Sequence, residues 1–255
     1  MKVTFLGTGT SQGIPVITCN CPVCRSTDEK DKRFRSSVLI EYMGKVFVID
    51  TGPDFRQQML REGVQKLDAV LITHQHKDHV AGLDDVRPFN FKQKKAIELY
   101  TEKRVEEALK REFAYVFADY RYPGIPEINI NIIDEKPFEI QGINIIPIRA
   151  YHLKLPVLGF RINNFAYITD TNNLPEKEWI KLEGTEVLVL NALRKTSHIS
   201  HYSLDEAVNV IKKIKPGKAF LTHISHMLGL HDDVQKELPE NIHLAYDGLK
   251  LKLDD

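Results

Sequence analysis

The stretch Thr73-His74-Gln75-His76-Lys77-Asp78-His79 follows the apolar run Asp68-Ala69-Val70-Leu71-Ile72, which has the composition of a buried strand. Four side chains that can bind a metal therefore lie within six residues at a strand end. His74 and His76 are two residues apart, so they share one side of an extended segment, whereas Asp78 and His79 come after the chain turns. Such a cluster is costly unless a cation neutralises and coordinates it. The stretch therefore predicts ligands directed towards two metal positions.

The composition limits the class of protein. A chain of 255 residues suffices for one large domain with a full core, and we expect residues 1–255 to form a single one. Lys plus Arg and Asp plus Glu both number 35, so the net charge is zero. This gives no support for a nucleic-acid groove of high charge and disfavours a nucleic-acid partner, although a local basic patch is compatible with it. The sequence contains no run of about 18 apolar residues, so we expect no membrane span. The apolar part of residues 1–7 is too short for a secretory signal.

The three cysteines all lie in the segment Cys19-Asn20-Cys21-Pro22-Val23-Cys24. An odd number of cysteines so close together does not fit a disulfide framework, and a reducing cytoplasm fits best. Three thiols in six residues suit a tetrahedral zinc site that needs one more ligand, and His226 is our candidate. The alternative is a loop with three reduced cysteines.

Polar side chains recur where further apolar strands end. Asp50 ends the strand predicted at residues 45–50, and three more such residues are His152, Asp170 and His223. Taken singly, His152 would be an ordinary loop histidine and Asp170 a turn residue, so it is their recurrence that favours a functional site.

Two helix starts can also be read from the sequence. His201 stands two residues before a helix that Ser203 and Glu206 open as a capping box. Asp54 is expected to cap a second helix at residues 55–61. Residues 7–13, by contrast, predict a glycine-rich turn with room for close backbone approach. They lack the Lys-Ser/Thr ending of a phosphate-binding loop.

Strands and helices alternate along the chain, with runs of neighbouring strands. This pattern predicts an α/β (α+β) fold of two packed sheets covered by helices. We assign residues 128–133, 138–140 and 143–150 to the second sheet. Residues 244–253 are expected to form a closing hairpin around Asp247-Gly248.

The HxHxDH motif at residues 74–79, followed by the later ligands in the same order, resembles the metallo-β-lactamase superfamily. The resemblance implies a four-layer αβ/βα sandwich of two mixed sheets. It assigns seven ligands to a dinuclear site: His74, His76 and His152 to one metal, Asp78, His79 and His223 to the other, and Asp170 to both. It gives Asp50 the role of orienting the ligand loop.

A carboxylate at the bridging position resembles the phosphodiesterase-type members of that superfamily. There, two cations about 3.5–4 Å apart hold a bridging hydroxide that attacks phosphorus in line. The ligands admit zinc, manganese or iron. The same resemblance gives Asp78 a catalytic role and makes His201 the general acid, with His198 as a weaker competitor.

The Cys-x-Cys-x-x-Cys cluster, the His-x-x-His pair His223 and His226, and the run Leu-Asp-Asp-Val-Arg-Pro-Phe-Asn at residues 83–90 resemble the PhnP group. These proteins are phosphoribosyl cyclic phosphate phosphodiesterases. The resemblance implies that His226 completes a structural zinc site with Cys19, Cys21 and Cys24. That zinc would join the N-terminal loop, at about residues 11–35, to the loop that carries His223. A small phosphodiester, with a cyclic ribose phosphate as one example, is the expected substrate.

Three other functions stay open at this point. A ribonuclease Z-like RNA endonuclease has a similar metal set, but it usually carries a Gly/Pro-rich basic arm that this sequence lacks. An accessory protein like PqqB shares the cysteine cluster. A metal- or nucleotide-binding sensor without turnover is the third. The oligomeric state is undetermined, and a homodimer is compatible with the sequence.

Overall fold

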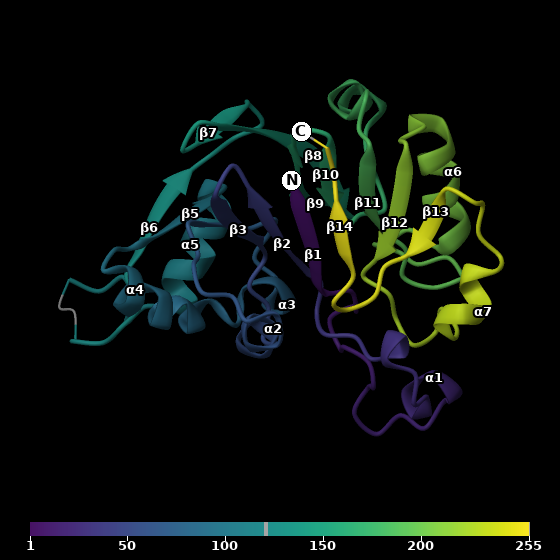
Figure 1. Cartoon of the computed structure of the whole chain (residues 1–255), viewed down its shortest axis with the longest axis horizontal. Coiled ribbons are helices and arrows are strands. Elements are labelled where there is room, and N and C mark those ends of the chain that lie inside the picture. The colour runs from purple at the N-terminus through teal and green to yellow at the C-terminus, as the bar shows by residue number, and fades with distance from the viewer. Residues whose placement is uncertain (120–121, 255) are drawn as a thin grey trace.

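The computed structural model describes residues 1–119 and 122–254, and these residues form two seven-stranded sheets that face each other (Figure 1). The order of the first sheet is β14-β1-β2-β3-β4-β5-β6. Its strands are β1 (Lys2–Gly7), β2 (Ser37–Tyr42), β3 (Lys45–Ile49), β4 (Ala69–Leu71), β5 (Ile97–Thr101), β6 (Ile128–Ile132) and β14 (Lys250–Lys252). The strands β14, β1, β2 and β3 pair antiparallel, and those from β3 to β6 pair parallel.

The second sheet has the order β13-β12-β11-β10-β9-β8-β7. Its strands are β7 (Phe138–Ile140), β8 (Ile143–His152), β9 (Leu155–Ile162), β10 (Phe165–Ile168), β11 (Val187–Asn191), β12 (Lys218–Thr222) and β13 (Ile242–Leu244). Those from β7 to β10 pair antiparallel, and those from β10 to β13 pair parallel. Each sheet is therefore mixed, and the two halves repeat the same plan.

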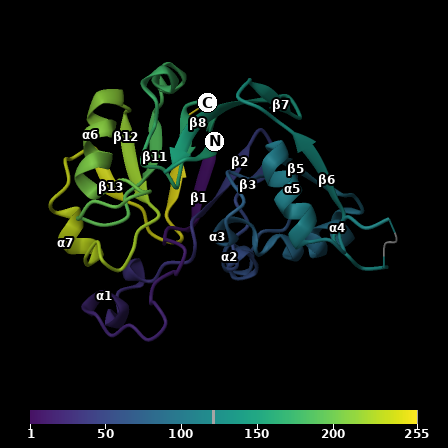
Figure 2. The same ribbon diagram turned by 180° about the vertical axis from the view of Figure 1, so that it is seen from behind.

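Helices cover the outer face of each sheet, and Figures 1 and 2 show α2, α4 and α5 beside the first sheet and α6 and α7 beside the second. The α-helices are α1 (Pro22–Arg25), α2 (Phe55–Glu62), α3 (Lys77–Val80), α4 (Arg87–Gln93), α5 (Lys103–Glu112), α6 (Leu204–Ile214) and α7 (His231–Gln235). Short 3-10 turns are η1 (Glu29–Asp31), η2 (Leu83–Val86) and η3 (Glu176–Leu182). Within the described residues, no helix has both the length and the apolar character needed to cross a membrane.

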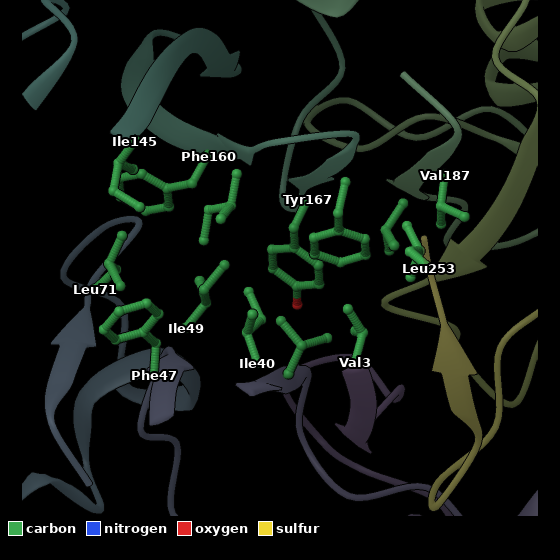
Figure 3. Packing of buried hydrophobic residues seen from close by; sticks show 14 of the residues in the cluster. Val3, Ile40, Phe47, Ile49, Leu71, Ile145, Phe160, Tyr167, Val187 and Leu253 are labelled. Atoms are coloured by element: carbon green, nitrogen blue, oxygen red, sulfur yellow. The ribbon is translucent and has the colours of Figure 1, made fainter. Parts of the chain in front are cut away.

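Three apolar layers hold the sandwich together. Between the sheets, Phe47 and Leu71 of the first sheet face Phe160 and Tyr167 of the second (Figure 3). A second layer packs β-strands against α2 and α5, and a third packs them against α6 and α7. The four-layer αβ/βα sandwich of two mixed sheets is thus confirmed. Its cause is the apolar character of both faces of the central strands.

Two strand assignments made from the sequence are wrong. The strand at residues 128–133 lies in the first sheet, because β6 pairs parallel with β5, whereas β7 pairs with β8 in the second sheet. Residues 244–253 form no hairpin, since β13 pairs with β12 in the second sheet and β14 pairs with β1 in the first. The turn at Asp247-Gly248 therefore crosses from one sheet to the other.

The helix caps gave one correct prediction and one wrong one. Ser203 and Glu206 form the expected capping box at the start of α6. Asp54 precedes α2, but its side chain makes no capping hydrogen bond. Its carboxylate instead accepts hydrogen bonds from the backbone N–H of Arg35 (2.8 Å) and from the Arg35 guanidinium (3.0 Å), because this cation competes with the helix for the acceptor.

Candidate active site

The strand ends turn abruptly at three site residues. Asp50 after β3, Asp170 after β10 and His223 after β12 have positive φ angles of 65°, 51° and 56°. A left-handed backbone costs a residue with a Cβ roughly 1–2 kcal/mol, and such strain concentrates at functional sites. All three side chains are buried and meet a common group of histidines. The three turns therefore bring side chains from both sheets to one place.

Asp170 lies at the centre of this group. Its Oδ2 atom is 3.1 Å from His79 Nε2 and 3.5 Å from His74 Nε2, and its Oδ1 atom is 2.7 Å from His223 Nδ1. His79 Nε2 is also 3.2 Å from Asp78 Oδ2. One carboxylate thus contacts histidines from both expected ligand sets, which is the arrangement that a bridging ligand needs.

The ligand atoms fall into three overlapping groups, within each of which they lie within 4.8 Å of one another. The groups are Asp78, His79, Asp170 and His223; His74, His76 and Asp170; and His152, Asp170 and His201. The structure therefore brings all seven expected ligands together. His152 groups with Asp170 and His201 and not with His74 and His76. The ring centroid of His152 is nevertheless 5.2 Å from that of His76.

Hydrogen bonds to the outer ring nitrogens orient the histidines. Asp50 accepts from His79 Nδ1 (2.7 Å), from the backbone N–H of Thr73 (2.8 Å) and from the Thr73 hydroxyl (2.9 Å). The Thr73 oxygen in turn lies 3.0 Å from His74 Nδ1. With a proton on Nδ1, each ring directs its Nε2 towards Asp170, and this is the nitrogen that would bind a metal. Asp50 therefore orients His79 directly and His74 through Thr73.

His152 is held in the same way. Its Nδ1 donates to the backbone carbonyl of Ser200 (2.8 Å), which leaves Nε2 free to bind a metal. This bond ties the end of β8 to the loop that carries His201. Thr73 and Ser200 have no feature in the sequence that marks them as partners of a histidine.

The charges in the cluster match a cation. Burial lowers the pKa of His79, but the carboxylates of Asp170, Asp78 and Asp50 outweigh it and raise that pKa well above its usual value. Burial likewise raises the pKa of Asp170, but the positive charges of His223 and His79 hold it well below its usual value. A divalent cation would take the place of the proton on His79.

One buried atom tests the fit of a metal directly. His223 Nδ1 lies 2.7 Å from Asp170 Oδ1 but has no hydrogen-bond partner. An unsatisfied buried nitrogen is costly, whereas two ligand atoms that converge without a hydrogen bond suit a shared metal ion. The donor set of imidazole and carboxylate groups is also one that zinc, manganese and iron accept. The residues present therefore fit a pair of divalent metals.

His201 lies beside the ligand rings, and its centroid is 4.5 Å from that of His152 and 4.9 Å from that of His223. Its Nδ1 is buried and has no hydrogen-bond partner. Burial and the His223 ring lower the pKa of His201 to about 3. His198 is more exposed, and its ring is tilted by 56° to that of His201 at a centroid distance of 5.1 Å, so burial beside the ligand rings favours His201 as the group that meets a substrate.

The cysteines converge on His226. Its Nδ1 atom is 3.2 Å from Cys19 Sγ, 3.4 Å from Cys21 Sγ and 3.6 Å from Cys24 Sγ. A tetrahedral zinc with bonds of about 2.3 Å to sulfur and about 2.0 Å to nitrogen separates such atoms by about 3.5 Å. A hydrogen bond from the backbone N–H of Cys24 is the main cause that lowers the pKa of Cys21 to about 6. The four side chains therefore fit the structural zinc site.

The chain is similar to known proteins in both sequence and structure. The family model described as "Beta-lactamase superfamily domain" matches residues 45–224. A solved structure described as a new diphosphatase from the PhnP family is 40% identical, with a TM-score of 0.93, and the match covers 99% of this chain and 98% of that one.

Two curated relatives add context. An octanoyltransferase from Porphyromonas gingivalis is 39% identical over 258 residues, which cover 100% of this chain. The chain spans 52% of that relative's length, or about half. A ribonuclease Z from Staphylococcus epidermidis is 26% identical over 292 residues, with 91% of each chain covered.

Proposed function

Because the chain belongs to the β-lactamase superfamily, and within it to the PhnP family, it is a metal-dependent hydrolase, and we propose that it hydrolyses small phosphodiesters. The observation that carries the proposal is the position of Asp170, whose two oxygens contact histidines of both ligand groups. A carboxylate between two metals about 3.5–4 Å apart suits in-line displacement at phosphorus.

The proposed ligands divide between the two metals. His74, His76 and His152 would hold one, Asp78, His79 and His223 the other, and Asp170 both. Two divalent cations bound there would neutralise charge on the phosphoryl oxygens and activate water for attack. Burial raises the pKa of Asp78, but the positive charge of His79 outweighs it and holds that pKa well below its usual value. Asp78 is therefore ionised and ready to bind a cation at neutral pH.

We propose that His201 acts on the leaving oxygen. Its lowered pKa means that the ring is neutral at neutral pH before substrate binds. A neutral imidazole can still donate a hydrogen bond, and a phosphodiester anion nearby raises the pKa of the ring because opposite charge favours the protonated form. Proton transfer from His201 would therefore depend on the bound substrate.

A second candidate is a small diphosphate esterified at both ends, such as a nucleoside diphosphate sugar, and it is favoured by the PhnP-family relative whose structure is described as a diphosphatase. Each phosphorus of such a molecule carries an ionised oxygen and two bridging oxygens, as in a phosphodiester. The same metals and the same proton donor would therefore serve both substrates. The cyclic ribose phosphate expected from the sequence is one small phosphodiester within this class.

Two other activities receive less support. The chain is neutral overall, which gives no general attraction for the phosphates of RNA. Acyl transfer is named for a relative about twice as long as this chain. Each of the three cysteines, which could otherwise accept an acyl group, lies within 3.6 Å of His226. We therefore assign neither activity to this chain.

The test compares four substrates with manganese or zinc present: bis(p-nitrophenyl) phosphate, a ribose cyclic phosphate, a nucleoside diphosphate sugar and a short RNA. We expect hydrolysis of the small esters by the wild type and none by Asp78→Ala, with the RNA left intact. Cleavage of the RNA alone would favour the nuclease. No hydrolysis, with both metals bound, would contradict the proposal and favour an accessory or sensor protein.

A further inference from the structure

The N-terminal turn reaches a ligand of the active site from outside the metal cluster. Thr10 Oγ1 lies 3.0 Å from His223 Nε2, and both residues are buried, with exposed fractions of 8% and 1%. His74, His79 and His152 are held at Nδ1, whereas His223 is held at Nε2. The remaining nitrogen of His223, Nδ1, is the one that faces Asp170 without a hydrogen-bond partner.

The backbone on both sides of His223 is tied to the same turn. The N–H of Thr10 donates to the carbonyl of Ile224 (3.0 Å), and the N–H of Ile224 donates to the carbonyl of Thr8 (2.9 Å). A Cβ atom at Gly9 would lie 2.9 Å from Arg33 Cβ, so the turn is closely packed on its other side. These bonds hold His223 in its left-handed backbone conformation, which would otherwise relax.

We propose that Thr10 is a positioning residue for the metal ligand His223. The Thr10 oxygen accepts the Nε2–H of His223, and this fixes the tautomer in which Nδ1 carries a free lone pair for a metal ion. The proposal rests on the metal site of the proposed function and not on the substrate.

The effect of Thr10 is confined to one of the two metals. His223 belongs to the group with Asp78 and His79, and it is not in the group formed by His74 and His76. Without the hydroxyl, Nε2 loses its acceptor, and the Asp170 carboxylate, 2.7 Å from Nδ1, favours the tautomer with the proton on Nδ1 by its negative charge. That tautomer cannot bind the metal. Loss of the Thr10 hydroxyl therefore weakens the binding of one metal and leaves the binding of the other unchanged.

The experiment measures metal binding without any substrate. The two catalytic metals are removed with a chelator, retention of the structural zinc is checked by elemental analysis, and Mn²⁺ is titrated by calorimetry. Thr10→Val removes the hydroxyl at nearly constant volume, and Thr10→Ser keeps it. Thr101→Val is the matched control, because Thr101 is also buried and its hydroxyl donates to the Ile72 carbonyl, which is not a candidate ligand.

We expect Thr10→Val to weaken one Mn²⁺ site about 10–100-fold, as is usual when the hydrogen-bond partner of a metal-binding histidine is lost. Thr10→Ser and Thr101→Val should bind as the wild type does. In a His223→Ala background, Thr10→Val should cause no further loss. Unchanged binding in Thr10→Val, equal weakening of both sites, or failure of Thr10→Ser to retain affinity would each overturn the proposal.

A second measurement needs no variant at all. In the wild-type protein loaded with zinc, the ¹⁵N shifts of the His223 ring should show the proton on Nε2. A proton on Nδ1 would overturn the proposal even if Thr10→Val did not fold. Neither measurement depends on hydrolysis. A failure of the proposed substrate class would therefore leave the metal-binding result intact, and the two failures can be told apart.

Discussion

Substituting Asp50 by asparagine should weaken metal binding while leaving the fold in place. Asp50 accepts from His79 Nδ1 at 2.7 Å and from the backbone N–H and hydroxyl of Thr73. An amide has one acceptor oxygen, so its NH₂ group must face either the Thr73 donors or His79 Nδ1. In the second case His79 shifts its proton to Nε2, which is the nitrogen that faces Asp170.

The magnitude follows from this one lost bond. A hydrogen bond to a charged group contributes about 1.5–3 kcal/mol. In the Asp50→Asn protein this is the free energy needed to return His79 to the metal-binding tautomer, so metal affinity should fall about 10–150-fold. The unfolding free energy should change less, because burial already raises the pKa of Asp50 and the substitution removes a buried charge.

Calorimetric titration with Mn²⁺, together with hydrolysis of bis(p-nitrophenyl) phosphate, measures both effects. Asp54→Asn is the matched control, since Asp54 also accepts from a backbone N–H, that of Arg35, and pairs with its guanidinium. It contacts none of the candidate ligands through these bonds. Wild-type Mn²⁺ affinity in a folded Asp50→Asn protein would refute the orienting role of Asp50.

Four further predictions concern other groups of the two sites. Cys21→Ser should release one equivalent of zinc and lower the melting temperature, and an unchanged zinc content by elemental analysis would reject the structural site. His201→Gln should lower the hydrolysis rate about 10²–10⁴-fold with both metals retained, and an unchanged rate would remove its role as proton donor. The apparent Mn²⁺ affinity should rise with pH up to the raised pKa of His79 and then level off, because below that pKa the metal must displace a proton. In the metal-free protein, the ion pairs between protonated His79 and the carboxylates around it stabilise the fold. That stabilisation is complete below the ordinary histidine pKa and is lost as the pH rises through the raised pKa of His79. Calorimetry over a pH series tests the first of these two predictions, and an Mn²⁺ affinity that falls with rising pH would contradict it. Thermal melts of the metal-free protein over the same series test the second.

Much of the fold can be predicted from the sequence because its signals are local. Alternating and continuous apolar runs predicted most strands, and Ser203 with Glu206 predicted the start of α6. These patterns report burial and helix ends, but they do not report which strand lies next to which. The wrong sheet for residues 128–133 and the false hairpin at residues 244–253 have this common cause, since strand pairing is decided by long-range packing.

The candidate ligands were also local signals, because histidines and carboxylates at the ends of apolar strands are distinctive. The roles of the ligands, and the homodimer considered above, stay predictions until metal content, activity and mass in solution are measured. Thr10, Thr73 and Ser200 could not be assigned from the sequence, because a hydroxyl or a carbonyl has no recognisable motif. The glycine-rich turn at residues 7–13 pointed to close backbone approach near Thr10, but not to the group that it approaches.

The sequence by itself determined the class of fold, the candidate ligands and the cysteine cluster, because each depends on residue types at short spacing. Only the tertiary structure decided which nitrogen of each histidine faces Asp170. That choice depends on the hydrogen bond at the opposite ring nitrogen, and for His223 the partner, Thr10, is 213 residues away in the chain. Packing of the two sheets brings these partners together, so the chemistry of the candidate site is completed by contacts that no local pattern records.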